Sequence, residues 1–185
     1  MDKEKHLSIL SNDIKLITRN LGEDNNIDQL FSQINKELKC TYLTYMIETE
    51  NFKVHFSSND DWQKAFVKDK LINVCPIYRN AFEAIKSQKN FVFTLWDAVP
   101  HLKGEEQDLM DLRHSYNIGH GLGLAIRQGK FRESLVLAGD ADNHKFSAQA
   151  VSNRAIIDSA LSTFRKSILS IFIHDSQNEK LVLRD

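Results

Sequence analysis

The chain has 185 residues, of which 42% are hydrophobic and 26% charged, as in one soluble globular domain and unlike a disordered or disulfide-stapled chain. Its 24 basic and 25 acidic residues leave a formal net charge of -1, so no net electrostatic attraction to nucleic acid or anionic lipid is available. Two cysteines, Cys40 and Cys75, are too few for a disulfide framework, and no apolar run is long enough to span a membrane or form a signal peptide. We therefore expect a cytoplasmic protein with no membrane partner.

Helices alternate with short strands in the predicted secondary structure. Helical spacing of apolar residues marks the helices, and short runs rich in aromatic and β-branched residues mark the strands. In chain order we expect a helix over 7–21 ending at Gly22, a helix from Asp28 to Leu38, strands Cys40–Ile47 and Phe52–Phe56, a helix capped by Ser58 or Asn59, a helix from Pro76, strand Phe91–Leu95, a helix around Leu109–Leu112, strands Gly119–Arg127 and Ser134–Ala138, and a long helix Ala148–Phe172.

This order of elements predicts the fold class. A strand hairpin near each end with helices between them suits an antiparallel sheet of about five strands with helices on both faces. We therefore expect an α+β protein, an α-β-α sandwich like PAS or GAF domains.

Known enzyme motifs are missing from the sequence. The stretch Gly119–Gly123 lacks the GxGxxG pattern, and glycines beside strands usually permit close approach of the backbone. His114 and His120 are six positions apart, which is not the spacing of a zinc-protease site. We expect no metal, no cofactor and no catalytic residue.

Cys75 allows two interpretations. It directly precedes the helix that begins at Pro76, and a helix N-terminus can activate a thiol as a nucleophile. The favoured alternative is a small buried apolar group. Catalysis would also need a histidine or carboxylate within hydrogen-bond reach of the sulfur.

Trp62 and Trp96 are the two tryptophans, and each lies where a predicted element begins or ends beside the sheet. A buried indole whose N–H faces a cavity is a good hydrogen-bond donor for a ligand carbonyl. Composition alone is equally consistent with two indoles that only fill the core.

Several of these residues together resemble the autoinducer-binding domain of LuxR-type quorum-sensing regulators. The similar features are Trp62 with Phe66 four positions on, Cys75 and Pro76, Trp96 at a strand end, and the stretch 111–140. The resemblance covers about residues 27–172. It implies a small-molecule sensor of a transcription regulator, whose α-β-α sandwich encloses an acyl-homoserine lactone.

The resemblance implies roles for four of these positions. Trp62 matches the tryptophan that donates its indole N–H to the lactone carbonyl, and Trp96 matches the one that packs against the lactone ring. Cys75 stands where the family has an aspartate that accepts the ligand's amide N–H, and sulfur is a much weaker acceptor. Ser58 replaces a tyrosine that bonds the acyl carbonyl, and its hydroxyl reaches less far.

Further positions complete the candidate ligand-binding set. Leu137 takes the place of a serine or threonine on the last strand, and Arg113 that of a small alanine. Thr44, Met46 and Phe66 are included as lining residues.

The changed positions alter the expected ligand. Loss of the aspartate alone would weaken binding of the usual amide ligand by about ten- to a hundredfold. We therefore expect altered ligand specificity. An inward-pointing Arg113 would favour an acidic or carbonyl-rich molecule, but we expect this arginine at the surface.

The sequence predicts a sensor domain over 1–175 and a linker over 176–185. Leu181–Asp185 resembles the opening of the LuxR-type helix-turn-helix, so we expect the sensor part of a longer regulator that contacts DNA only through that domain. A chain that ended at Asp185 would instead be a solo sensor that titrates partner regulators. We expect a homodimer, formed by apolar positions of the first and last helices. The alternative function is a PAS- or GAF-like interaction module with a filled core and no ligand.

Overall fold

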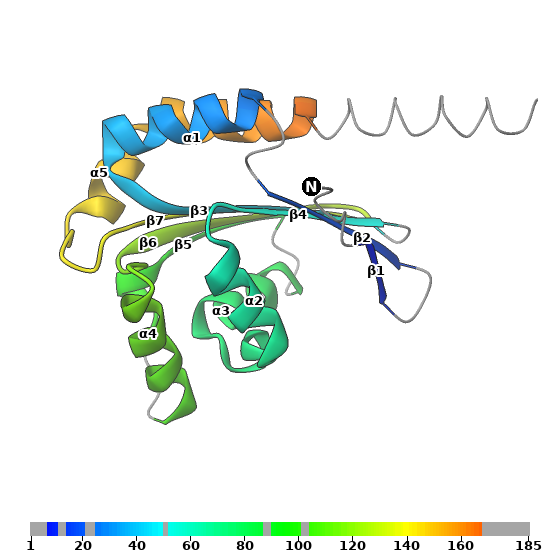
Figure 1. Cartoon of the computed structure of the whole chain (residues 1–185), viewed down its shortest axis with the longest axis horizontal. Helices are drawn as coiled ribbons and strands as arrows, with labels where there is room; N and C mark the ends of the chain where they lie inside the picture. The colour runs from blue at the N-terminus through cyan, green and yellow to red at the C-terminus, as the bar shows by residue number, and fades with distance from the viewer. Residues whose placement is uncertain are drawn as a thin grey trace, which may run out of the picture.

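One sheet runs through the structure in the strand order β1-β2-β4-β3-β7-β6-β5 (Figure 1). The structure is a computed structural model that describes residues 7–10, 14–20, 25–49, 52–86, 90–100 and 104–167. The strands are β1 (Leu7–Leu10), β2 (Ile14–Asn20), β3 (Cys40–Glu48), β4 (Phe52–Ser57), β5 (Phe91–Leu95), β6 (Gly121–Gln128) and β7 (Phe131–Gly139). The helices are α1 (Asn25–Leu38), α2 (Asp60–Lys68), α3 (Pro76–Lys86), α4 (Glu105–Ser115) and α5 (Phe146–Ser152), with the short 3-10 helices η2 (Leu71–Val74) and η3 (Trp96–Ala98) and a further helix over 154–167.

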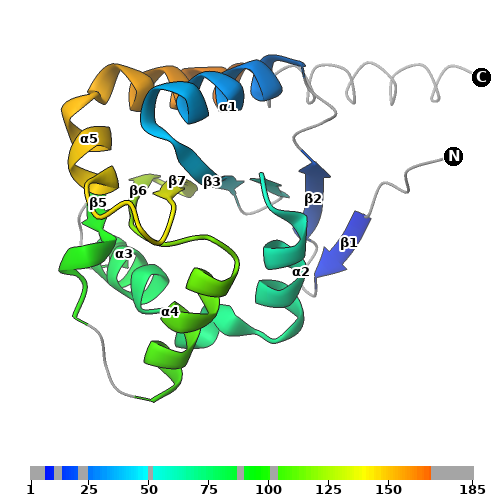
Figure 2. The same ribbon diagram turned by 60° about the vertical axis from the view of Figure 1, so that its left-hand side comes forward.

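Strands β4, β3, β7, β6 and β5 are antiparallel throughout and correspond to the predicted sheet. Helices α1, α5 and 154–167 cover one face of this sheet, which we call the α1 face. Helices α2, α3 and α4 lie on the opposite face, the α2 face (Figure 1, Figure 2). The predicted α+β class and α-β-α sandwich are therefore confirmed.

The helix predicted over 7–21 is wrong. Its described residues form the strands β1 and β2, and β2 runs parallel to β4 with Ile17 opposite Val54. The segment is rich in isoleucine, which loses side-chain freedom in a helix, and the edge of β4 offers backbone groups that a strand can pair. The sheet is thereby wider than predicted.

The predicted long C-terminal helix is divided. Asn153 ends α5 with φ -109° and ψ 56°, and the second helix starts at the next residue. The rest of the predicted helix, the linker 176–185 and its Leu181–Asp185 segment lie outside the described residues. Within the described ranges, no helix is long and apolar enough to cross a membrane.

The larger hydrophobic core lies on the α1 face, and it contains a buried charge. Tyr45 stacks on Phe164 with ring centroids 4.5 Å apart. Glu133, 1% exposed, accepts a hydrogen bond of 2.5 Å from the Tyr45 hydroxyl and bonds of 2.9 and 2.5 Å from Arg165. These bonds raise the pKa of Arg165, while burial and the Glu133 carboxylate raise the pKa of Tyr45. The buried carboxylate on this face is therefore fully paired.

Candidate functional site

Helix α2 places a tryptophan against the sheet. The side chain of Asn59 caps the helix by accepting a 2.9 Å hydrogen bond from the Trp62 backbone N–H, which confirms the predicted cap. The Trp62 indole is buried, with its ring centroid 5.5 Å from that of Phe66 and 5.3 Å from that of Tyr116. Helix α2 thus supplies one aromatic wall of a cluster on the α2 face.

Trp96 follows β5 and lies flat against the neighbouring strand. A Cβ atom added at Gly121 would lie 2.8 Å from the Trp96 ring and 2.9 Å from the Leu137 carbonyl oxygen. Glycine is therefore required for this close approach, which agrees with the interpretation of the glycine-rich stretch. Trp96 is 2% exposed, and its Nε1 has no hydrogen-bond partner in the described part of the chain.

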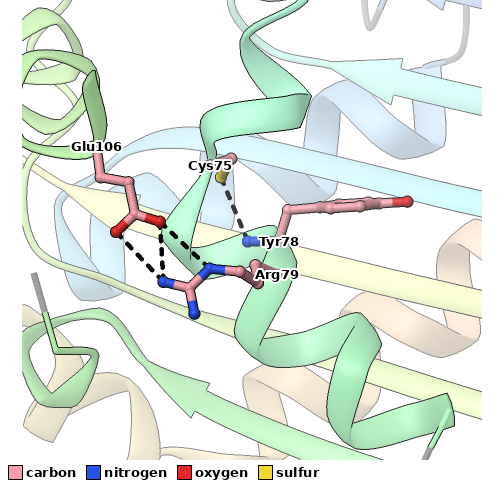
Figure 3. Close-up of polar contacts among 4 residues, drawn as sticks. All are labelled: Cys75, Tyr78, Arg79 and Glu106. Atoms are coloured by element: carbon pink, nitrogen blue, oxygen red, sulfur yellow. Dashed lines mark hydrogen bonds and ion pairs between the residues drawn. The ribbon is translucent and has the colours of Figure 1, made fainter. Parts of the chain in front are cut away.

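Cys75 directly precedes α3, which begins at Pro76 as predicted. Its buried sulfur accepts hydrogen bonds from the Tyr78 backbone N–H at 3.3 Å (Figure 3) and from Arg113 Nη2 at 3.1 Å. These described partners include neither a histidine nor a carboxylate, which the interpretation as a nucleophile requires. Burial raises the pKa of the other thiol, Cys40, to about 12.

Arg113 lies inside the molecule, so the expected surface position is wrong. The side chain is 5% exposed, and its guanidinium carbon lies 5.3, 5.8 and 5.0 Å from the ring centroids of Trp62, Phe66 and Trp96. Leu109, one helical turn earlier, is also buried, which places both residues on the inner side of α4. The four-residue spacing between Leu109 and Arg113 is the sequence signal that predicts an inward-facing arginine.

Helices α3 and α4 are joined by an ion pair near the surface. Arg79 donates to the Glu106 carboxylate through Nε at 3.2 Å and through Nη2 at 2.9 and 3.2 Å (Figure 3). Because Arg79 is 42% exposed, solvent screens the pair, and it contributes less than about 1 kcal/mol. Its effect is to orient α4, which carries Arg113.

Tyr42, on β3, connects the sheet to this cluster. Its ring packs in the same buried cluster as Trp62 and Trp96. Burial raises the pKa of Tyr42, whereas the positive charge of Arg113 lowers it. Of the two indoles in this cluster, the one whose buried N–H has no partner in the described structure is that of Trp96.

Thr44 holds a histidine at the edge of the same face. The Thr44 hydroxyl donates to the Phe56 carbonyl oxygen at 2.7 Å, and its oxygen lies 2.8 Å from His55 Nε2. Since the hydroxyl proton is already used, His55 donates in this bond. Burial, and secondarily the charge of Lys53, lower the pKa of His55 to about 4.

Comparison with known proteins identifies the family. A family model described as an autoinducer binding domain matches residues 25–167. The chain belongs to this autoinducer-binding family. It has no significant match among curated proteins.

Solved structures share the fold of this autoinducer-binding domain at low sequence identity. Escherichia coli SdiA has a TM-score of 0.52 and 10% identity, over 77% of this chain and 62% of the SdiA chain. SdiA in complex with octanoyl-rac-glycerol gives a TM-score of 0.52 and 9% identity, over 77% of this chain and 60% of that chain. The chain therefore spans less than two thirds of SdiA.

CepR2 from Burkholderia cenocepacia, described as an N-acylhomoserine lactone dependent LuxR family transcription factor, has a TM-score of 0.50 and 11% identity, over 73% of this chain and 90% of that chain. At such identities the likeness shows the fold alone. The expected sandwich is thus found in LuxR-type proteins.

Five of the candidate residues of this autoinducer-binding domain meet in one place. They form the aromatic cluster, which we define as the buried group on the α2 face around Arg113, with residues from α2, η2, α3, η3, α4 and the sheet. Its members include Tyr42, Trp62, Phe66, Cys75, Ile77, Trp96, Leu109, Met110, Arg113, Ile118, Val136 and Ala138.

The remaining candidates lie elsewhere. The hydroxyl oxygen of Ser58 is held against β3, where it accepts a 2.8 Å hydrogen bond from the Leu43 N–H. Met46 packs with the adjacent cluster that contains Ile85. Leu137 faces the core on the α1 face and is removed from the candidate site, because successive residues of a strand point to opposite faces.

Two polar residues of the α2 face were missed in the sequence. Tyr42 is two residues from Thr44 on β3, and Thr94 is two residues from the buried Val92 on β5. Residues two apart on a strand point to the same face, so strand periodicity predicts the positions of both. Thr94 is 4% exposed, and its hydroxyl has no partner among the residues that the structure describes. The same residues contain no group of three or more histidine, cysteine, aspartate or glutamate side chains placed to hold a metal ion.

Proposed function

We propose that this chain is the small-molecule sensor domain of a LuxR-type transcription regulator. The observation that carries the proposal is the aromatic cluster, where buried polar atoms of Trp96 and Arg113 have no partner within the described ranges. Buried polar atoms in proteins almost always have a partner, so these atoms indicate a ligand that supplies one. Membership of the autoinducer-binding family supports the same function.

The ligand differs from an ordinary acyl-homoserine lactone. Cys75, in the place of the amide acceptor, already receives two N–H donors, and the hydroxyl of Ser58 is bonded to the backbone. The position that would accept the amide N–H is therefore already used within the protein, whereas the Ser58 hydroxyl only accepts in its bond with Leu43 and keeps its proton to donate. SdiA has been solved in complex with octanoyl-rac-glycerol, a molecule without an amide, and that complex supports a wider range of ligands on this fold.

Binding acts by stabilising one state of the domain. A ligand that completes the aromatic cluster binds the folded domain and shifts its folding or dimerisation equilibrium. We assign contact with DNA to a helix-turn-helix domain rather than to this sensor domain, and we infer that the sensor acts as a homodimer. Of the two helices expected to form the dimer, 7–21 contains strands instead, and the described part of Ala148–Phe172 has one exposed large hydrophobic residue, Val151, so we assign the dimer to no helix.

Native mass spectrometry of the protein purified from its own host tests the proposal. We expect a retained small molecule, lost in Trp96→Phe, which keeps a ring but removes the indole N–H. The matched control is Phe91→Leu on the same strand segment, where the side chain is 52% exposed. Retention by the control and loss in Trp96→Phe support a ligand in the cluster, and absence of any bound molecule supports the interaction-module alternative.

Calorimetry with N-octanoyl-homoserine lactone tests the altered specificity. We expect weak binding, because Cys75 is a poor acceptor for the amide N–H. Tight binding that is unchanged in Cys75→Ala contradicts the altered specificity but not the sensor function.

A further inference from the structure

Arg113 is a buried charge without an opposite charge. Its contacts in the described structure are three aromatic rings and one sulfur, and it makes no ion pair there. Its Nε is buried with no hydrogen-bond partner. By contrast, Arg79 and Arg165 each bond a glutamate through two nitrogens.

The environment of Arg113 offsets only part of the cost of burying it. Aromatic faces attract a guanidinium, and sulfur is a weak acceptor, but neither replaces the water or the carboxylate that a charged group needs. The side chain is thus held in a defined orientation, and its Nε–H has no acceptor in the described structure. A buried arginine in this condition is suited to an anion that arrives from outside the protein.

Other orphaned polar atoms lie on the same face. Trp96 Nε1 belongs to the indole that lies 5.0 Å from the guanidinium carbon, and Thr94 precedes Trp96 by two residues. Thr94 pairs with Gly123 on β6, two residues from the Gly121 that underlies Trp96. A Cβ atom added at Gly123 would meet just one atom within 4 Å, a methyl of Val136 at 3.7 Å, so the face is not crowded beside Thr94.

We infer that Arg113 binds the carboxylate of a small amphiphilic molecule, with Trp96 and Thr94 as additional hydrogen-bonding groups. This inference rests on the proposed sensor function and names its ligand class. A planar monoanion matches the guanidinium in charge and shape, whereas a phosphate dianion would leave excess negative charge in the interior. The remaining surface of the cluster is aromatic and aliphatic, so the body of the ligand is apolar.

Matched pairs of acids and neutral derivatives test the charge. The probes are octanoate and methyl octanoate, 4-hydroxycinnamate and its methyl ester, and N-octanoylhomoserine and its lactone, each titrated calorimetrically into the full chain. In at least one pair we expect the acid to bind about ten- to a hundredfold more tightly than its neutral partner. Arg113→Met, which keeps the length but removes the charge, abolishes this preference.

The control variant is Arg79→Met, which removes a guanidinium from the surface pair with Glu106. It keeps the preference for the acid. The carboxylate inference is overturned if the neutral partner binds as tightly as the acid, or more tightly, in every pair that binds. It is also overturned if the preference for the acid survives in Arg113→Met. Neither result contradicts the sensor function. If neither acids nor neutral partners bind, and native mass spectrometry finds no ligand, both proposals fail.

The stability of the ligand-free protein gives a second readout. An unpaired buried charge destabilises the fold, so Arg113→Met raises the Tm of the free protein by about 2–4 °C. Addition of the binding acid raises the Tm of the wild type and leaves that of Arg113→Met unchanged. A fall in the Tm of ligand-free Arg113→Met shows that the guanidinium is a structural support and overturns the inference.

Discussion

The two faces of the sheet each bury a charged side chain, and they satisfy it differently. On the α1 face, Glu133 bonds both Tyr45 and Arg165, so its charge and its lone pairs are used within the protein. On the α2 face, Arg113 has aromatic rings and the Cys75 sulfur, and its Nε has no partner among the described residues.

If the proposed function holds, the α1 face serves stability and the α2 face serves binding. Natural proteins retain destabilising buried groups mainly where function needs them. The paired carboxylate joins helix 154–167 to the sheet, whereas the unpaired guanidinium lies in the aromatic cluster, where we propose that a ligand binds. Variants on the α1 face should therefore change the free energy of unfolding, and variants on the α2 face should change it less or in the opposite direction.

Phe164→Ala should have the largest effect. Phe164 is fully buried and stacks on Tyr45 at 4.5 Å, so its truncation leaves a cavity in the larger core. We expect a loss of about 4 kcal/mol in the free energy of unfolding, measured by urea denaturation. Phe66→Ala, which truncates a partly buried ring of the aromatic cluster, should cost less than half as much. Equal losses at the two positions contradict the division of the faces.

Glu133→Ala should have the next largest effect. It removes a carboxylate that is 1% exposed, and it leaves the Tyr45 hydroxyl buried without its acceptor. We expect a loss of about 3 kcal/mol in the free energy of unfolding. The matched control is Glu48→Ala on the neighbouring strand, which breaks pairs with Arg132 and Lys53 nearer the surface and should cost less than about 1 kcal/mol.

Gly121→Ala and Gly123→Ala compare two glycines of β6 that lie on the α2 face with different amounts of free space around them. The added methyl at Gly121 would collide with the Trp96 ring and with backbone, whereas at Gly123 it meets only Val136 at 3.7 Å. We expect Gly121→Ala to lose about 2 kcal/mol and to shift the fluorescence of Trp96, and Gly123→Ala to lose much less. A similar loss in the free energy of unfolding for both variants would show that the packing of the Trp96 indole does not require a glycine at position 121.

The fold was predictable from sequence where local signals agreed with tertiary pairing. Pro76 and Asn59 begin their helices as predicted, and the hairpin of β3 and β4 follows its strand pattern. Residues 7–21 were mistaken for a helix because apolar spacing was weighed above β-branched composition, and the partner that pairs with them, β4, is distant in sequence.

The site was predictable in its aromatic residues and not in its polar ones. The family likeness brought Trp62 and Trp96 together correctly, because large aromatic residues keep their place in a core. Leu137, expected in the site, lies in the core of the α1 face, since adjacent residues of a strand point to opposite faces of the sheet. Arg113 was assigned to the surface on residue type, although its spacing from Leu109 already indicated the inner side of α4.

His55 tests the α2 face through an effect that appears only as the pH is lowered. Burial lowers the pKa of His55 from 6.5 to about 4, so the unfolded chain binds more protons than the folded protein between these values. This contribution to stability is therefore present above pH 6.5 and is lost as the pH decreases toward 4, by about 2 kcal/mol between pH 7 and pH 5. His55→Gln, which can still donate to Thr44, should lose this part of the pH dependence in urea titrations at both pH values. Because other groups titrate in both proteins, the difference between wild type and variant is the measurement. If that difference does not change with pH, His55 is solvated and the α2 face carries no buried imidazole.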